Sequence, residues 1–217
     1  MPEPALILKG LEDIANGLWP VAALWHALAA AALVAVVRGW RPSSRLVAGL
    51  LLLPLASVAV AAWTHANPFN GLTFVGLVLA LGWLGLRLPA SPPGPAPRWT
   101  TWAGIAMTTF GLVYPHFTHV TSPFGYLYAA PTGLVPCPTL SLAIGVVLIA
   151  GGLGSRAFSL VLAGAGLFYG VFGVARLGVV LDVGLIAGAL ALSALGLCLR
   201  KSPRQESSAA PTAPTSP

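Results

Sequence analysis

The chain has 217 residues, of which 57% are hydrophobic and only 7% are charged. A soluble domain carries about 25% charged residues, so this composition excludes a soluble globular protein and indicates a multi-pass membrane protein. The net charge of +6 does not indicate a nucleic-acid partner, because the basic residues are spread along the chain rather than gathered on one soluble face. The length suits one compact helical bundle rather than two domains.

Apolar runs of about twenty residues, the length that crosses a bilayer as a helix, divide the chain. We expect seven transmembrane helices, near residues 18–37, 45–64, 70–88, 101–120, 137–154, 157–176 and 181–199. The predicted fold is therefore an all-α membrane protein with a single bundle over residues 1–201. The last three runs are glycine-rich and weakly separated, so six spans remain an alternative. Residues 202–217 are rich in Ser, Ala, Thr and Pro and are expected to form a disordered tail.

The basic residues follow the predicted connections. Nine of the eleven Lys and Arg residues fall on one side of the seven-span arrangement: Arg38, Arg41, Arg45, Arg87, Arg98, Arg156, Arg200, Lys201 and Arg204. Only Lys9 and Arg176 fall on the other side. Because cytoplasmic loops carry the excess of Lys and Arg, the N-terminus is predicted to lie outside and the C-terminus in the cytoplasm.

Two prolines flank a cysteine where the fifth run begins. Pro136 and Pro138 have no backbone N–H and disfavour helix in the residues before them. We therefore expect Cys137 to lie on irregular backbone. Such backbone is tolerated at membrane depth only where protein buries it or where it lines a wet cavity.

Polar side chains gather on the predicted outer side. His116 and His119 are three residues apart, and we expect them on one face at the outer end of the fourth span. Thiolate and imidazole ligands select soft transition-metal ions. The candidate metal ligands are therefore Cys137, His26, His65, His116 and His119. Asp182 and Tyr114 are expected to have a proton or charge role, and an ion pair between Arg176 and Asp182 is an alternative for that carboxylate.

Several short motifs carry a resemblance to a known family. They are Trp19-Pro20 before the first span, Asn67-Pro68 after the second, Tyr114-Pro115 in the fourth, the segment from Pro131 to Thr139 that ends in Pro-Cys-Pro-Thr, and Gly178 with Asp182 before the last span. With these motifs the chain resembles an uncharacterised family of bacterial seven-span membrane proteins that contain a domain of unknown function. The resemblance implies a multi-pass protein of the bacterial cytoplasmic (inner) membrane and implies no activity. The family's Gly-His-x-Tyr-Pro stretch is altered here, where His119 to Pro123 takes its place.

A looser likeness is limited to the segment from Gly133 to Pro138. It is similar to the Gly-x-x-Pro-Cys segment that opens a membrane helix in nickel/cobalt exporters and in thiol-reductant carriers. The exporters' His- and Asp-rich first helix and the carriers' second redox cysteine are absent from this sequence. This likeness therefore concerns local structure.

Three classes of function remain open. The first is binding or transport of a small soft ligand, such as a transition-metal ion, through an outward-facing cavity. The second is a thiol or haem redox membrane enzyme that uses Cys137, although no Ser–His–Asp, Walker or zincin pattern is present. The third is an assembly or accessory protein without a ligand. The expected partners are the lipid bilayer and a second copy, because glycines four apart (166 and 170, 184 and 188) allow close helix packing.

Overall fold

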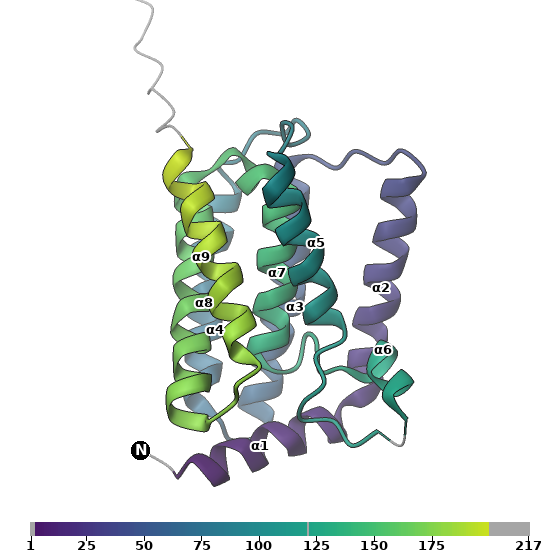
Figure 1. The fold of residues 1–217 in the computed structure, drawn as a ribbon, viewed down its shortest axis with the longest axis vertical. Helices are drawn as coiled ribbons and strands as arrows, with labels where there is room; N and C mark the ends of the chain where they lie inside the picture. Colours follow the sequence, from purple (N-terminus) through teal and green to yellow (C-terminus); the bar gives the residue numbers. More distant parts are fainter. Residues whose placement is uncertain (1–2, 121, 200–217) are drawn as a thin grey trace, which may run out of the picture.

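The structure is a computed structural model that describes residues 3–120 and 122–199. Every regular element in that range is helical. In chain order the elements are α1 (Pro4–Gly17), α2 (Trp19–Val37), α3 (Ser44–Thr64), α4 (Pro68–Gly85), α5 (Arg98–Leu112), the 3₁₀ turn η1 (Pro123–Gly125), α6 (Tyr126–Ala129), α7 (Pro136–Ile149), the 3₁₀ turn η2 (Gly151–Gly154), α8 (Arg156–Leu177) and α9 (Asp182–Cys198). Figure 1 shows the longer helices side by side, with α1 lying across one end of them. We call this the α1 end.

Local sequence signals explain where several helices begin. The side chains of Ser43, Asn67 and Ser155 accept hydrogen bonds from backbone N–H groups in the first turns of α3, α4 and α8. These caps satisfy donors that have no partner inside the helix. Pro68 then occupies the first turn of α4, where a missing N–H costs nothing.

The prediction of an all-helical protein is confirmed for the described residues. Four helices, α2, α3, α4 and α8, are long and apolar enough to cross a membrane, and each begins and ends within three residues of an expected span. Helices α7 and α9 are shorter apolar helices. The expected tail, residues 202–217, lies outside the described residues.

The expected span at 101–120 is wrong in its second half. Helix α5 ends at Leu112, and the chain then runs without regular structure through Tyr114 and Pro115. A residue before proline disfavours the helical region, so this dipeptide favours an end of the helix here. His116 and His119 therefore do not lie on a helix, and Phe117 between them has a left-handed φ of 71°.

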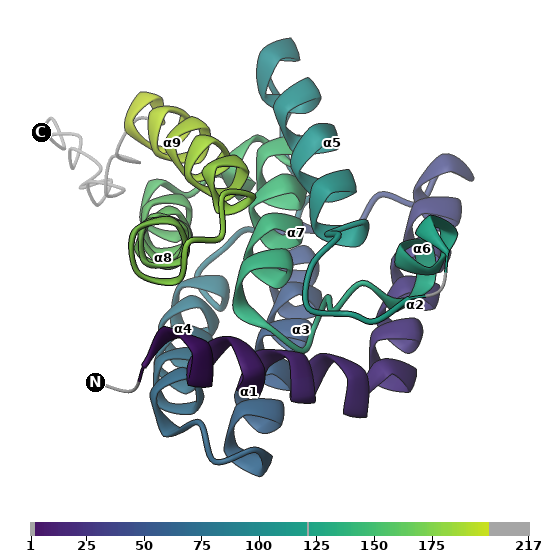
Figure 2. The ribbon, with the colours of Figure 1, turned by 60° about the horizontal axis from the view of Figure 1, so that its bottom comes forward.

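The N-terminal helix α1 was not predicted from the sequence. It buries Leu11, Ile14 and Ala15, and it leaves Asp13 exposed. Figure 2 brings this end forward and shows α1 crossing the end of the bundle toward the first turn of α2. An amphipathic helix in this position covers the helix ends that enclose the site described below.

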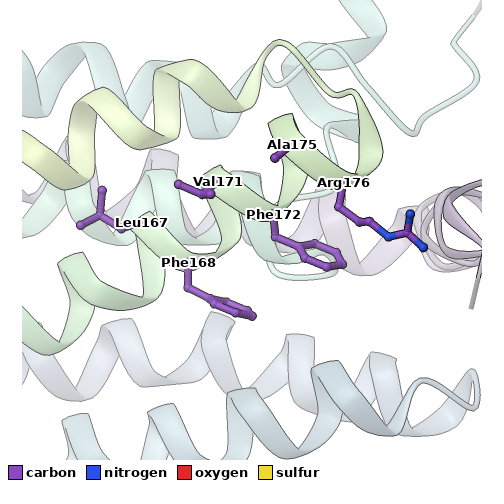
Figure 3. Close-up of a pocket in the computed structure, with 6 residues that line it drawn as sticks. All are labelled: Leu167, Phe168, Val171, Phe172, Ala175 and Arg176. Atoms are coloured by element: carbon purple, nitrogen blue, oxygen red, sulfur yellow. The ribbon is translucent and has the colours of Figure 1, made fainter. Parts of the chain in front are cut away.

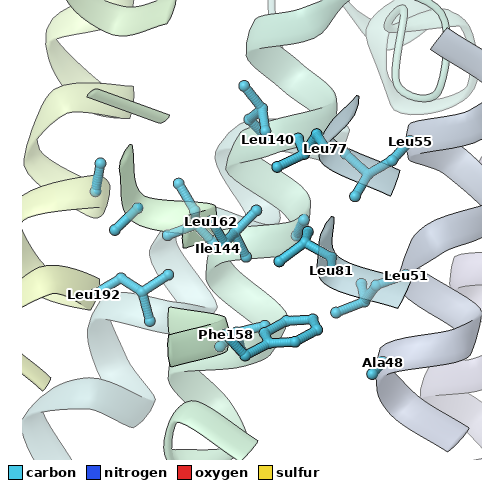
Figure 4. Close-up of a cluster of buried hydrophobic side chains, with 14 of the residues drawn as sticks. Ala48, Leu51, Leu55, Leu77, Leu81, Leu140, Ile144, Phe158, Leu162 and Leu192 are labelled. Carbon is cyan, nitrogen blue, oxygen red and sulfur yellow. The ribbon is translucent and has the colours of Figure 1, made fainter. Parts of the chain in front are cut away.

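The core lies where α3, α4, α7, α8 and α9 meet. Figure 4 shows leucine and isoleucine side chains from these helices pointing toward one another around α7, among them Leu55, Leu81, Ile144 and Leu162. Most residues of α7 are buried, as expected of a helix with neighbours on all sides. Helix α2, by contrast, is apolar all round, but Ala22 is its one buried residue.

The glycines that suggested association between copies pack against other helices of the same chain. A Cβ on Gly166 would meet Ile144 and Ala189, and one on Gly188 would meet Met107. Their small size therefore allows α8 and α9 to approach each other and the neighbouring helices of the same chain.

Candidate functional site

A buried carboxylate at the α1 end accepts hydrogen bonds from two side chains on other elements. Asp182 is only 1% exposed. The Tyr114 hydroxyl donates to its Oδ1 at 2.7 Å, and the Cys137 Sγ donates to its Oδ2 at 3.2 Å. We call these three residues the Asp182 cluster. It joins the start of α9, the start of α7 and the segment that follows α5.

Tyr114 is held in place by aromatic neighbours. Its ring packs edge-on against Phe110 at 5.3 Å and stacks on Phe117 at 6.3 Å between ring centroids. The side chain is fully buried, and a buried tyrosine hydroxyl needs a polar partner. The Asp182 carboxylate supplies this partner.

Cys137 lies in the first turn of α7, so the expectation of irregular backbone at this residue is wrong. Helix α7 begins at Pro136, which places both prolines among the first three helical residues. The N–H groups of these positions have no partner inside a helix, so prolines there start the helix rather than break it. The cysteine is partly buried, with its sulfur on the Asp182 carboxylate.

The irregular backbone lies just before Cys137, in residues 130–135. Thr132 donates from its hydroxyl to the Gly111 carbonyl at 2.6 Å, and the Gly133 N–H donates to the Thr139 hydroxyl at 2.8 Å. Gly133 has φ +78°, and a Cβ at this position would overlap the Trp25 ring. This segment is therefore buried and fixed by hydrogen bonds, as non-helical backbone between membrane helices must be.

Helix α8 closes the site from the other side. Gly173 lies so close to Asp182 that a Cβ on this glycine would overlap the carboxylate oxygen Oδ2. One turn earlier, Gly170 packs in the same way on Ile186 of α9. The carboxylate is thus held in a tightly packed space between α7, α8 and the tyrosine.

The sequence left an ion pair with Arg176 as an alternative for Asp182. The carboxylate oxygens accept from Tyr114 and Cys137, whereas Arg176 is exposed near the end of α8. The two residues are close in sequence, but the aspartate side chain is directed into the bundle.

His26 and His65 both bond to backbone rather than to the Asp182 cluster. His26 faces the bundle, with Nε2 2.7 Å from the Leu112 carbonyl oxygen and Nδ1 2.8 Å from that of Ala22. It thereby links α2 to the end of α5. His65 is exposed at the C-terminal end of α3, where its Nδ1 lies 2.9 Å from the Ala61 carbonyl oxygen.

Of the other two histidines, His116 lies beside the Asp182 cluster and His119 does not. Its ring packs on Phe117 at 4.2 Å and lies 6.4 Å from the Tyr114 ring, and its buried Nε2 has no hydrogen-bond partner among the described residues. His119 is exposed and lines a surface cavity of about 320 Å³ with Asn16, Trp19 and Tyr128.

The five candidate metal ligands are therefore not brought together. Within residues 3–120 and 122–199, no group of three or more His, Cys, Asp and Glu side chains is placed to hold a metal ion. A transition-metal site in a protein normally has at least three protein ligands.

Sequence reasoning missed two features of the interior, the close approach at Gly173 and a second buried polar pair. Gly173 carried no signal, because it is one of 25 glycines. A second buried pair joins α8 to α4, where the Tyr169 hydroxyl donates to the Asn70 Oδ1 at 3.0 Å. A tyrosine and an asparagine inside predicted spans were a usable signal, because polar groups in a membrane need partners.

No protein-family model, curated protein or solved structure matches this chain.

Proposed function

We propose that this is a multi-pass protein of the bacterial cytoplasmic membrane in which Asp182 binds and releases a proton, and that this step is coupled to the passage of a small ligand. The observation that supports the proposal is the buried carboxylate with two neutral donors on separate elements. An ionisable residue inside a membrane bundle is costly and typically belongs to an ion path or a proton relay.

The hydrogen bonds of Asp182 link its protonation to the contacts between the elements that hold it. An ionised carboxylate accepts from both Tyr114 and Cys137, whereas a protonated one also has a donor of its own. The new O–H group needs an acceptor, which the Tyr114 oxygen or the Cys137 sulfur supplies if that group turns round. Protonation of Asp182 therefore changes the contacts between α9, α7 and the segment after α5.

The charge distribution supports a seven-span arrangement with the α1 end outside. The described arginines of the connections, namely Arg38, Arg41, Arg45, Arg87, Arg98 and Arg156, lie at the end of the bundle away from α1. Lys9 and Arg176 lie at the α1 end. Because the positive-inside rule places the arginine-rich end in the cytoplasm, the Asp182 cluster lies toward the outside.

This arrangement predicts a reporter result. A fusion after Ser91 is expected to report the cytoplasm, and a fusion after Tyr128 is expected to report the outside, because α5 separates the two positions. Alkaline phosphatase and green fluorescent protein fusions at the same sites give opposite signals and serve as mutual controls. The same side for both positions would show that α5 does not cross the membrane.

The geometry favours proton binding over the two other chemical functions. For soft-metal transport, no group of three or more donor side chains is placed to hold a metal ion in the described part of the chain. A thiol enzyme needs a neighbour that favours the thiolate, such as a cationic group in contact with the sulfur, but the hydrogen-bond partner of the Cys137 sulfur is a carboxylate. The next experiment distinguishes proton binding at Asp182 from a purely structural role in an accessory protein.

The test uses the fact that the chain has only two aspartates, Asp13 and Asp182. Protein labelled with ¹³C at the aspartate carboxyl in lipid bilayers gives two signals by solid-state NMR, and Asp182→Asn and Asp13→Asn assign them. Asp13 is exposed on α1 and serves as the internal control. We expect the Asp182 signal to move between its ionised and protonated positions over the pH range in which the protein stays folded.

Tyr114→Phe provides the second part of this test. Loss of the hydroxyl that donates to Oδ1 is expected to shift the pH at which the Asp182 signal changes and to leave Asp13 unaffected. An Asp182 signal that stays constant throughout that pH range would contradict proton binding and favour a structural carboxylate.

A further inference from the structure

An apolar groove runs along the outer surface of α8 and ends at a basic side chain. It has a volume of about 480 Å³ and is lined by Leu167, Phe168, Val171, Phe172, Ala175 and Arg176. Figure 3 shows the two phenylalanine rings on the same side of the helix, with the Arg176 guanidinium beyond them. The groove is separate from the Asp182 cluster.

The residue spacing explains this arrangement. Phe168, Phe172 and Arg176 are four residues apart and so share one face of α8. The two rings stack with 6.2 Å between centroids, and Phe69 of α4 contacts Phe168 at 6.1 Å. The result is an apolar surface on α8, about two helical turns long, with Phe69 of α4 beside it.

The position of Arg176 is unusual for this protein. It and Lys9 are the two basic residues of the described chain at the α1 end, whereas six arginines lie at the opposite end. Arg176 is one residue from the C-terminal end of α8, which places its guanidinium at the level where a membrane helix meets the headgroups. An arginine there extends its charge to the interface and keeps its aliphatic part along the apolar surface.

We propose that this groove binds one anionic phospholipid, with an acyl chain along Phe168 and Phe172 and the phosphate on Arg176. The groove is apolar along its length and positive at its interfacial end, which matches the charge and polarity of such a lipid. A guanidinium binds a phosphate through paired hydrogen bonds, and the aromatic surface contacts the acyl chain. The proposal does not depend on proton binding at Asp182.

The test compares lipids that differ only in headgroup charge. The purified full-length protein in detergent is mixed with equal amounts of phosphatidylglycerol and phosphatidylcholine carrying the same acyl chains, and the lipids retained are counted by native mass spectrometry. We expect preferential retention of phosphatidylglycerol. Arg176→Gln should reduce that preference about five-fold, which corresponds to one basic residue near an anionic lipid, and Arg176→Lys should keep part of it.

Two controls make the result specific to the groove. Arg156→Gln removes the same charge at the other end of α8 and should leave retention of this lipid unchanged. Val171→Trp fills the exposed groove and should reduce retention of both lipids. The proposal is overturned if Arg176→Gln keeps the wild-type lipid preference, or if Arg156→Gln reduces it equally. The Arg176 charge would then stabilise the C-terminal end of α8 without binding a lipid.

Discussion

Replacing Gly173 by alanine is expected to destabilise the protein by about 3 kcal/mol or to prevent its folding, since overpacking a tight interior costs about 1–3 kcal/mol and here also displaces a buried carboxylate. A Cβ at this position would overlap the Asp182 Oδ2. To make room, α8 must move away from α9, or Asp182 must leave its hydrogen bonds with Tyr114 and Cys137. The measurement is the free energy of unfolding in mixed detergent micelles.

Helix α8 contains a matched control. Gly164 is also inside the helix, but nothing lies within 4 Å of a Cβ placed there. Gly164→Ala should therefore be neutral or stabilise the protein by up to about 1 kcal/mol, because alanine favours helix over glycine. Equal destabilisation by the two substitutions would show that α8 and α9 do not pack as the structure describes.

The helices that could be predicted are those whose apolar runs have clear ends. Helix α3 follows Arg38 and Arg41 and is capped by Ser43, and α4 begins at an Asn-Pro pair. Local sequence therefore determines both helices. Helix α5 was extended too far because apolar residues continue past its end, and hydropathy alone outweighed the Tyr114-Pro115 dipeptide that stops it.

The sequence predicted which residues belong to the site, but not which of them contact one another. Tyr114, Cys137 and Asp182 were each candidates, because polar residues in an apolar chain are conspicuous. Their pairing joins positions 68 and 45 residues apart, and no local pattern encodes such a contact. For Asp182 the sequence left two alternatives open, a proton or charge role and an ion pair with its sequence neighbour Arg176, because sequence alone does not show which way the carboxylate points from α9.

For the Asp182 cluster itself we predict that substitutions of Tyr114 and Asp182 have coupled effects on the free energy of unfolding. Hydrogen bonds to a charged group contribute about 1.5–3 kcal/mol, and bonds between neutral groups contribute about 1 kcal/mol. Tyr114→Phe should therefore reduce the free energy of unfolding by about 2 kcal/mol when Asp182 is ionised. The same substitution should cost less in an Asp182→Asn background, where the acceptor carries no charge.

The other buried tyrosine serves as the control for this cycle. Tyr169 donates to the neutral amide oxygen of Asn70, so Tyr169→Phe should cost about 1 kcal/mol whether or not Asp182 is present. Cys137→Ala, which removes the second donor to the carboxylate, should behave like Tyr114→Phe, with a smaller effect because a thiol is a weak donor. A double-mutant cycle of Tyr114 and Asp182 that is additive would contradict a charged carboxylate at this site, and with it the proton exchange proposed for Asp182.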